Sequence, residues 1–326
     1  MQQVKQTRWG IIGLGNIANT FASDLAFVPN AILHAVASRD LNKAEAFKTT
    51  YAANKAYSSY ETLAKDPDID IIYIATPHVF HFENAKLCIT YGKAVLCEKP
   101  MGMNANQVTE LCDLAKKNKV FLMEAMWTAF LPNFNRLMEL VDSEKLGKVI
   151  SFKADFGFKA DFIPTSRLFD KNLGGGSILD IGIYPIFACL SLLKKPTSIT
   201  TNAIIGQTGV DESCIINFNY PKSLKAELKS TLLENTPTEI YIQFEQGVAI
   251  LGPNFYGPSD LKVIESDGNE IIYPKNTQGS GYQFEATHVQ ELFHNKNIES
   301  SVMSHAKSIE LATYLDIVLQ EIGVIY

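Results

Sequence analysis

The first 125 residues alternate short apolar segments with longer amphipathic ones, and this rhythm limits the folds open to the chain. The apolar segments have the length of strands, and the segments between them carry apolar residues at helical spacing. Repeated βα units of this kind predict a doubly wound parallel sheet with helices on both faces. The expected strands are 9–12, 31–37, 69–75, 94–97 and 120–123, and the expected helices are 16–27, 42–53, 82–91 and 104–117.

The pattern changes after about residue 126. Segments of alternating polarity follow one another without a regular helix between them, joined by turn-rich pieces such as Gly252-Pro253-Asn254. This favours a second α+β domain with a mostly antiparallel sheet, so we predict domains at 1–125 and 126–326. The expected strands are 149–158, 198–205, 214–220, 225–232, 239–244 and 261–264, and helices at 177–193, 282–294 and 304–321 should cover one face.

Charge and composition argue against nucleic-acid and membrane partners. The chain of 326 residues has a net charge of −6 and no cluster of lysines and arginines. Binding to nucleic acid or to an anionic membrane would require such a cluster. Its N-terminus is polar, and its longest apolar stretch, 178–193, is shorter than the roughly 20 residues of a membrane span. The five cysteines include no CxxC pair, which is typical of reduced thiols. We therefore expect a cytoplasmic protein.

A glycine-rich turn, Gly13-Leu14-Gly15-Asn16-Ile17-Ala18, follows the first expected strand and opens a helix. This is the context of a dinucleotide-binding loop. Gly13 permits the tight turn, Gly15 lets the backbone approach a pyrophosphate, and Ala18 lets the helix pack against the strand. The helix N-terminus adds N–H groups and a partial positive charge. The residues expected to bind the cofactor are Gly13, Gly15, Asn16, Ile17 and Ala18; the alternative is an ordinary glycine turn.

The end of the second strand indicates which dinucleotide binds. Enzymes that use NAD usually carry an acid there, hydrogen-bonded to the ribose 2′-hydroxyl. This chain has Ser38-Arg39-Asp40, with Lys43 close behind. Ser38 can donate to a 2′-phosphate, and Arg39 can pair with it and stack on adenine. We expect NADP rather than NAD, with Ser38, Arg39 and Lys43 as ligands; in the alternative, Asp40 binds the ribose and Arg39 is only solvated.

Two further motifs, Thr76-Pro77-His78 and Glu98-Lys99-Pro100, stand where apolar strands of the parallel sheet end. Ligands of open α/β folds bind at this carboxyl edge, and a lysine there can hold a substrate hydroxyl. The residues expected to border the cofactor are Thr76, Pro77, His78 and Glu98, and Lys99 is expected to contact substrate. His78 and His81 have the spacing of metal ligands, but no third ligand is near, so we predict no metal. A capped loop histidine is the alternative for His78.

Residues 174–184 form the second informative block. Three glycines permit close approach of the backbone, and Asp180 and Tyr184 share a face if the segment is helical. An aspartate and a tyrosine in apolar surroundings need partners or a ligand. The alternative is that Asp180 caps the helix and Tyr184 packs in the core. We also expect Trp127 and Arg167 to contact substrate; core packing and surface exposure are the simpler alternatives for them.

On these motifs the chain resembles the Gfo/Idh/MocA oxidoreductase family over essentially its whole length. The matching motifs are the glycine-rich turn, Glu98-Lys99-Pro100 and residues 174–184, in that order. The resemblance implies an N-terminal Rossmann domain and a C-terminal open-faced sheet that often forms a dimer interface, so we expect a homodimer. It also implies that Lys99 and Tyr184 are the catalytic pair, with Asp180 beside them.

Tyr184, where many members have histidine, points to one subgroup together with Ser38-Arg39 and Met126-Trp127-Thr128. This subgroup contains the dimeric dihydrodiol dehydrogenases and the NADP-dependent aldose (D-xylose) dehydrogenases. The chain departs from the pattern at Ala129, where the subgroup often has arginine. The resemblance therefore leaves the exact substrate open.

The activity that the resemblance implies is hydride transfer between a nicotinamide and a carbon of a sugar, polyol or vicinal diol. Tyr184 is the expected general acid/base, and the Lys99 ammonium favours its phenolate form, although the two roles can be exchanged. Asp180 should orient the substrate hydroxyl or hold Lys99. Two alternatives stay open. One is an NAD-dependent inositol-type or anhydro-sugar oxidoreductase. The other is a non-catalytic nucleotide sensor, against which the presence of Lys99, Asp180 and Tyr184 argues.

Overall fold

The computed structural model describes residues 6–326, and their contacts divide the chain into two compact units. Unit 1 consists of the described part of Met1–Trp127 together with Gln278–Glu310. Unit 2 consists of Thr128–Thr277 and Leu311–Tyr326. Each unit is therefore built from two separate stretches of chain, whereas the sequence predicts a single division after residue 125.

Unit 1 contains a six-stranded parallel sheet. Its strands are β1 (Thr7–Ile12), β2 (Ala31–Ala37), β3 (Lys55–Tyr57), β4 (Ile71–Ile74), β5 (Ala94–Glu98) and β6 (Leu122–Ala125). Its helices are α1 (Asn16–Leu25), α2 (Leu41–Tyr51), α3 (Tyr60–Lys65), α4 (His81–Thr90), α5 (Ala105–Asn118) and α8 (Tyr282–His294). The strand order is β3-β2-β1-β4-β5-β6. This order changes direction between β1 and β4, which is where doubly wound folds bind their ligands.

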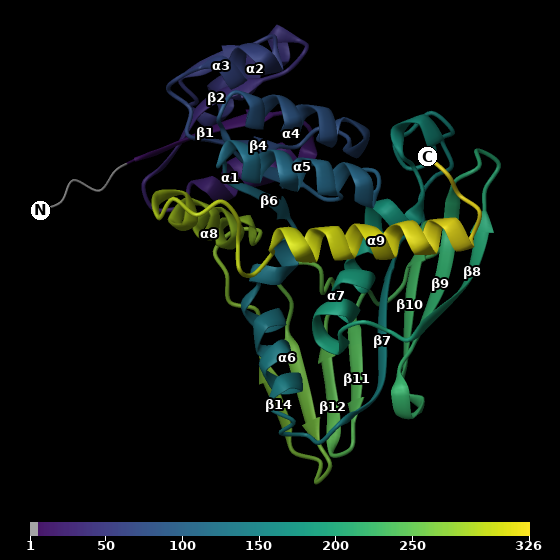
Figure 1. Ribbon diagram of the computed structural model, residues 1–326. Coiled ribbons are helices and arrows are strands. Elements are labelled where there is room, and N and C mark those ends of the chain that lie inside the picture. The colour runs from purple at the N-terminus through teal and green to yellow at the C-terminus, as the bar shows by residue number, and fades with distance from the viewer. Residues whose placement is uncertain (1–5) are drawn as a thin grey trace, which may run out of the picture. The chain divides into compact units, whose positions relative to one another are not determined.

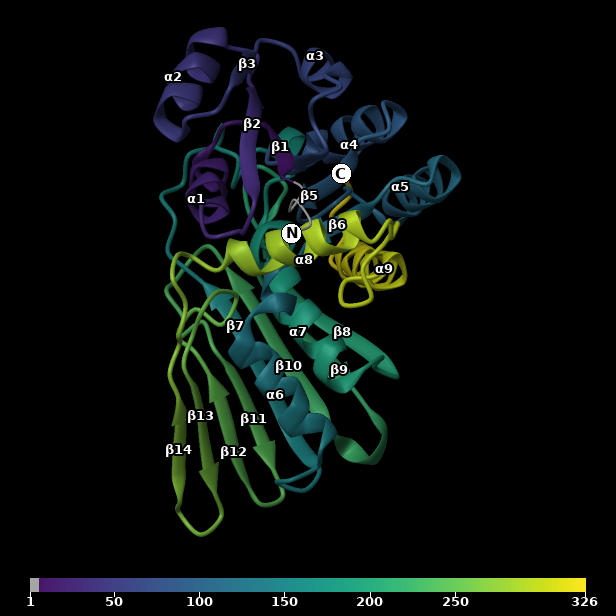
Figure 2. The same cartoon turned by 90° about the vertical axis from the view of Figure 1, so that its left-hand side faces the viewer.

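Helices cover both faces of this parallel sheet. α1 and α2 lie on one face and α3, α4 and α5 on the other (Figure 1 and Figure 2), and α8 packs against α1. All four residues of β4 are fully buried as a result. Burial on both faces explains why this strand is a continuous apolar run instead of an alternating one. The predicted doubly wound sheet is confirmed.

Unit 2 contains an eight-stranded sheet. Its strands are β7 (Val149–Gly157), β8 (Ser198–Ile205), β9 (Asp211–Asn219), β10 (Lys225–Thr231), β11 (Ile240–Phe244), β12 (Gly247–Leu251), β13 (Leu261–Glu265) and β14 (Glu270–Tyr273). They are ordered β14-β13-β12-β11-β7-β10-β9-β8. β7 and β10 pair in parallel, and the other neighbours are antiparallel. The predicted second sheet, mostly antiparallel, is confirmed.

The eight-stranded sheet has one covered face and one open face. The helices α6 (Pro132–Asp142) and α7 (Ile183–Leu193) lie on the covered face, as Figure 1 and Figure 2 show. Residues that point to this face, such as Phe152 and Leu228, are buried, whereas their neighbours Lys153 and Glu227 are exposed. A sheet packed on one side requires this alternation. A last helix, α9 (His305–Glu321), begins in unit 1 and ends in unit 2.

The structure contains elements that the sequence does not predict, namely β3, α3, α6, β12 and β14. β3 has three residues and α3 has six. Segments this short do not show the hydrophobic period of a strand or a helix. The segment 177–193, predicted as one helix, begins instead as a π-helical turn, Ile178–Gly182, and continues as α7. Turns of this kind occur frequently at functional sites.

One helical segment, Lys171–Leu193, is long and apolar enough to cross a membrane when only length and composition are considered. However, 83% of its most apolar window is buried inside the protein. Burial of that extent is typical of a core helix.

Candidate active site

The glycine-rich turn between β1 and α1 has the shape that a pyrophosphate requires. Gly13 has a φ of +85°, and a Cβ at this position would lie 2.7 Å from the backbone nitrogen of Thr76, so only glycine fits. A Cβ at Gly15 would meet nothing within 4 Å, which leaves space above the turn. α1 begins at Asn16, and among residues 6–326 no side chain caps its first N–H groups.

The end of β2 carries the groups that should distinguish NADP from NAD. Ser38 is buried, and its Oγ accepts a hydrogen bond from the N–H of Asp40 at 3.2 Å. The Asp40 carboxylate caps α2, accepting from two backbone N–H groups of the first turn at 2.9 and 3.4 Å. Arg39 is exposed, and its guanidinium lies over the Phe80 ring, 5.8 Å from the ring centre. Asp40 thus has a structural role, and Arg39 is the charged group held beside Ser38.

A buried imidazole links the loops that follow β4 and β5. The nitrogens of the His81 ring lie 2.7 Å from the carbonyl oxygens of Thr76 and Pro100. Burial lowers the pKa of His81 to about 4, although the two carbonyl oxygens act in the opposite direction. The ring of His78, which is also buried, lies edge-on to that of His81 at 6.5 Å. Both nitrogens of His81 thus lie against backbone carbonyls, and the absence of a metal here stays a prediction. His81 fixes the backbone next to Lys99, whose peptide bond to Pro100 is cis.

Buried carboxyl groups also brace the turn that carries Lys99. The N–H of Lys99 donates to Glu98 Oε2 at 3.2 Å, and the N–H of Met101 donates to Glu124 Oε1 at 2.9 Å. The Tyr73 hydroxyl donates to the other oxygen of Glu98. Burial raises the pKa of Glu124 to about 7. Glu98 therefore supports the turn from inside unit 1, and its contact with a cofactor stays a prediction.

In unit 2, Asp180 and Tyr184, the two residues of segment 174–184 that the sequence predicts to act in the site, lie next to Arg167. Arg167 Nη1 donates to Asp180 Oδ1 at 2.9 Å. The Asp180 charge is the main cause that raises the pKa of Arg167, and Tyr184 contributes in the same direction. The Asp180 side chain is 11% exposed, whereas that of Arg167 is 57% exposed. The structure therefore brings Arg167, Asp180 and Tyr184 together and gives Asp180 a partner that the sequence did not indicate.

An aromatic wall, made of Phe156 and Tyr256, lies beside Tyr184. The two rings stack with their centres 4.3 Å apart and an interplanar angle of 7°. The Tyr184 ring lies 5.8 Å from Phe156 and 5.5 Å from Tyr256. Thr128 Oγ1 holds the loop of Tyr256 by donating to its carbonyl oxygen at 2.6 Å. The outer face of such a stacked pair is apolar and suits one face of a sugar ring or an aromatic diol.

Three other predicted residues have local neighbours. Trp127 is 7% exposed and stacks on Tyr282 within unit 1, with ring centres 4.3 Å apart. Lys43 is exposed in the first turn of α2, and Pro77 precedes the short 3₁₀ turn His78–Phe80. Contact of these residues with cofactor or substrate stays a prediction.

A group of residues with metal-ligand chemistry lies elsewhere in unit 1. His34, Asp66 and Asp68 offer ligand atoms within 4.8 Å of one another. The Lys55 ammonium already contacts both carboxylates, at 2.9 Å from Asp66 and 3.1 Å from Asp68. Although burial acts in the opposite direction, hydrogen bonds lower the pKa of Asp66 to about 2. The lysine thus supplies the positive charge of this cluster.

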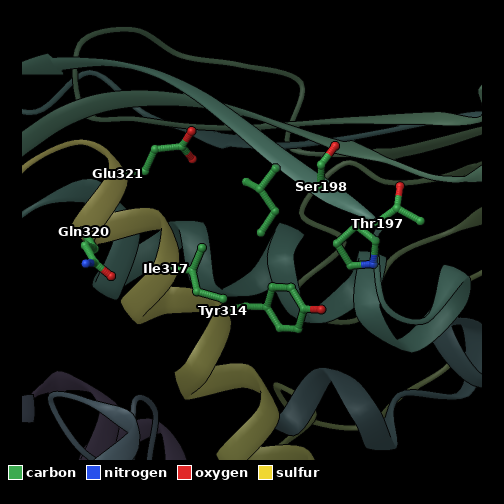
Figure 3. A pocket seen from close by; sticks show the side chains of 8 residues that line it. Thr197, Ser198, Tyr314, Ile317, Gln320 and Glu321 are labelled. Carbon is green, nitrogen blue, oxygen red and sulfur yellow. The ribbon is translucent and has the colours of Figure 1, made fainter.

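Two cavities of unit 2 do not include the residues described above. One, of about 450 Å³, lies between the start of β8 and α9, and Ser198, Tyr314 and Glu321 are among the residues that line it (Figure 3). The other, of about 410 Å³, is lined by Asn133 and Arg136 of α6 and by the segment after β14. Neither is lined by Asp180 or Tyr184, so these two side chains of the candidate site lie outside both cavities.

The sequence did not indicate that Tyr256 and Glu124 contribute to the candidate site. It also did not indicate that His81 holds the backbone of two loops. Tyr256 stands in a loop between Pro253 and Gly257, where an aromatic residue among turn-formers is the available signal. Glu124 is an acid inside the apolar strand β6, and a buried acid needs partners. That rule could have identified Glu124 without a structure. Only the tertiary contacts identify the carbonyl partners of His81.

Comparison with known families gives two matches that together span most of the chain. Residues 7–126 match the oxidoreductase family Gfo/Idh/MocA with its NAD-binding Rossmann fold, and residues 134–250 match the Gfo/Idh/MocA C-terminal domain. The chain is 38% identical over 332 residues to the trans-1,2-dihydrobenzene-1,2-diol dehydrogenase of Mus musculus, with 98% of both proteins covered. It is 37% identical over 331 residues to the enzyme of that name from Xenopus tropicalis, covering 98% of this chain and 99% of that protein.

Several solved structures share the fold at low sequence identity. The aldose-aldose oxidoreductase of Caulobacter crescentus, complexed with glycerol, has a TM-score of 0.88 and 20% identity, with 97% of each chain covered. A levoglucosan dehydrogenase in complex with NADH and levoglucosan has a TM-score of 0.86 and 17% identity, covering 98% of this chain and 97% of that chain. A 3-ketoreductase from Actinomadura kijaniata, in complex with NADP and TDP-benzene, has a TM-score of 0.84 and 22% identity, covering 97% of this chain and 98% of that chain.

Proposed function

Because the chain belongs to the Gfo/Idh/MocA family of oxidoreductases, we propose that it transfers a hydride between NADP and a CH–OH carbon of a sugar, polyol or vicinal diol. The observation that carries this proposal is the cluster in unit 2, where the ion pair of Arg167 and Asp180 lies beside Tyr184 and the aromatic wall. Polar groups that converge on an aromatic surface suit a small molecule with several hydroxyl groups. Relatives named as dihydrodiol dehydrogenases agree with such a substrate.

NADP is proposed over NAD because of the groups at the end of β2. The Ser38 hydroxyl and the Arg39 guanidinium are donors suited to a 2′-phosphate. Asp40, the alternative ribose ligand, caps α2. The space above Gly15 and the uncapped N-terminus of α1 fit a pyrophosphate. When bound, the nicotinamide ring supplies the hydride acceptor or donor.

The proton in this proposal is moved by a tyrosine and a lysine. Tyr184 Oη takes the proton of the substrate hydroxyl during oxidation and returns it during reduction. Lys99 Nζ binds the same hydroxyl, and its charge favours the phenolate form of Tyr184. The bracing of the Lys99 turn by Glu98 and Glu124 limits the positions that the ammonium can reach.

The remaining residues of the cluster orient the substrate. Arg167 holds the Asp180 carboxylate, which is proposed to accept a hydrogen bond from a second substrate hydroxyl. Phe156 and Tyr256 provide the surface against which the ring of the substrate lies. Orientation of this kind raises the rate because the reacting atoms meet in the correct geometry.

The proposal is tested by initial rates of NADP⁺ and NAD⁺ reduction with xylose, glucose, inositols and a trans-dihydrodiol. Wild type is expected to oxidise at least one of them and to prefer NADP⁺. Lys99→Met is expected to abolish turnover and to leave NADPH binding largely intact, because the variant removes a charge and not the dinucleotide loop. Lys117→Met, at an exposed position of α5, is the matched control. Substantial turnover by Lys99→Met would refute the assigned role.

A second variant separates the roles of the catalytic pair. Tyr184→Phe removes only the hydroxyl and is expected to lower kcat by about 10²- to 10⁴-fold, the usual contribution of a general acid/base. Tyr91→Phe is the control, since its hydroxyl bonds the exposed Glu61. If Tyr184→Phe keeps most of its turnover while Lys99→Met has none, the lysine transfers the proton and the roles are exchanged.

We also propose a homodimer and a cytoplasmic location. The open face of the eight-stranded sheet is the proposed dimer interface, and its test is given in the Discussion.

All five cysteines are buried and unpaired, and burial raises the pKa of Cys112, Cys189 and Cys214 to about 12. Thiols protected in this way are expected in a reducing compartment.

A further inference from the structure

The segment that carries the proposed catalytic residues of unit 2 starts at two glycines, Gly175 and Gly176. A Cβ on Gly176 would lie 2.4 Å from Asp211 Oδ1 and 2.7 Å from Tyr326 Oη. Gly176 has a φ of +116°, which other residues rarely adopt. A carboxyl group and a phenol therefore meet the backbone directly before the π-helical turn, and glycine is required for their approach.

Asp211, at the start of β9, caps this turn. It is 0% exposed, and its Oδ2 accepts hydrogen bonds from Ser177 Oγ at 2.7 Å and from the N–H of Ile178 at 2.8 Å. Ser177 Oγ also lies 2.8 Å from Ser230 Oγ. One oxygen of Asp211 thus fixes the first residues of the turn, and the other, Oδ1, faces the phenol.

Tyr326 lies on the other side of Gly176. Its hydroxyl donates to the carbonyl oxygen of Gly175 and interacts with the Asp211 carboxyl group. A phenol has one proton, and here Gly175 accepts it, so a proton on Asp211 would complete the link to Tyr326 Oη. Burial raises the pKa of Asp211 to about 6 and also raises the pKa of Tyr326. The nearby thiol of Cys214 is neutral, since burial raises its pKa to about 12.

We propose that Asp211 and Tyr326 are positioning residues, which together fix the backbone of residues 175–178 and thereby orient Asp180 and Tyr184. Neither of them touches substrate or cofactor in this scheme. They act through the π-helical turn, whose hydrogen-bond pattern is rare and whose first residues are bonded by Asp211 from outside the helix. The catalytic consequence rests on the proposed function, whereas the structural part concerns contacts within unit 2 alone.

Substitutions at the two residues test the catalytic consequence. Tyr326→Phe removes one hydroxyl from a residue that is 37% exposed, so the fold should survive. Its kcat is expected to fall roughly tenfold, as for one lost, partly buried hydrogen bond. Asp211→Ala should lower kcat on the order of 100-fold. Asp211→Asn should keep kcat within about threefold of wild type, because its amide can accept from Ile178 and donate to Tyr326. KM and NADPH affinity should stay nearly constant in all three.

A matched control is Asp267→Ala, which removes a carboxylate that accepts one backbone N–H in an exposed turn of the same unit. It should leave kcat unchanged. If Tyr326→Phe has the kcat of wild type, or if Asp211→Asn loses as much kcat as Asp211→Ala, the two residues do not position the site and the inference is wrong.

Hydrogen exchange of the backbone amides in residues 174–184 gives a readout that needs no turnover. Exchange is expected to be faster in Tyr326→Phe and Asp211→Ala than in wild type, Asp211→Asn and Asp267→Ala. If wild type oxidises none of the substrates, the proposed function fails, and the exchange rates alone then decide the inference. Unchanged exchange in Tyr326→Phe overturns it in either case.

Discussion

At the scale of single residues, Arg39 is the side chain with the clearest expected effect on specificity. It follows the buried Ser38 at the end of β2, and its guanidinium lies over the Phe80 ring. Contact between a cation and an aromatic ring limits where the guanidinium can go. Asp40, one residue on, accepts hydrogen bonds from the first turn of α2. The positive charge of this segment thus lies over an aromatic ring, and its negative charge caps a helix.

Arg39→Ala is expected to lower kcat/KM for NADP⁺ by about 10- to 100-fold, because a hydrogen bond to a charged group contributes about 1.5–3 kcal/mol. The value for NAD⁺, which lacks the 2′-phosphate, should change little. Steady-state kinetics with both dinucleotides and the best substrate measure this difference. Lys48→Ala, in the last turn of α2 and paired with Glu45, is the control. Equal losses for the two dinucleotides would mean that Arg39 does not recognise the 2′-phosphate.

At the scale of elements, the turn between β5 and α5 shows how a short loop is made rigid. It contains the Lys99–Pro100 peptide bond, and its backbone is bonded by Glu98, Glu124 and His81. These three side chains come from β5, β6 and α4. The side chain of a lysine has four rotatable bonds. The fold therefore controls the position of the lysine backbone more directly than that of its ammonium group. The loop is thus held by elements that are distant from it in sequence.

Glu124 makes this element sensitive to pH. Burial raises its pKa in the folded state to about 7, above the ordinary value of 4.5. Between these two values the folded state binds a proton that the unfolded state has lost, so the contribution of Glu124 to stability is fully present below pH 4.5 and is lost as the pH rises through 7. The loss is on the order of 3 kcal/mol, at about 1.4 kcal/mol per pKa unit.

Glu124→Gln should remove this part of the pH dependence, since glutamine does not titrate. The free energy of unfolding in urea, measured from pH 4.5 to pH 8, is expected to fall less steeply in the variant than in wild type. Glu110→Gln, at a position exposed on α5, should follow wild type. Parallel curves for wild type and Glu124→Gln would show that folding does not raise the pKa of Glu124.

At the scale of the whole molecule, the open face of the eight-stranded sheet is the surface with an expected partner. Strand register places Tyr241, Ile250, Lys262 and Ile272 in one row across β11 to β14. Ile272 is 55% exposed, and the other three are half-buried. Tyr241, Ile250 and Ile272 place apolar surface on the face of the sheet opposite α6 and α7, and such exposed apolar surface is typical of a protein interface. We propose that a second copy of this chain covers this open face.

Ile250→Lys is expected to convert a dimer into a monomer, because it buries a charge at the centre of the proposed interface. Sedimentation velocity across a range of protein concentrations measures the change. Leu41→Lys is the control, since Leu41 is 47% exposed on α2 of unit 1. Wild type that sediments as a monomer, or a variant that stays dimeric, would contradict the proposed interface.

The sequence by itself determined the features that neighbouring residues encode. The alternation of strands and helices, the turn at Gly13 and Gly15, and the positions of Lys99 and Tyr184 are local patterns. Each follows from backbone geometry or from the period of a helix or strand, which a stretch of a few residues is enough to specify. The fold class and the family could therefore be predicted correctly, including a continuous apolar β4 buried on both faces.

Only the tertiary structure decided which distant residues meet. No local pattern indicates that Arg167 pairs with Asp180, that Tyr256 stacks on Phe156, or that Asp211 caps the turn before Asp180. The sequence also assigned 278–310 to the second domain, whereas this stretch belongs to unit 1. Such contacts depend on loop closure over tens to hundreds of residues and on which buried polar groups find partners. The physical reason is that the free energy of such a contact arises in the packed interior, between residues that are far apart in the sequence. No period or motif along the chain therefore marks it.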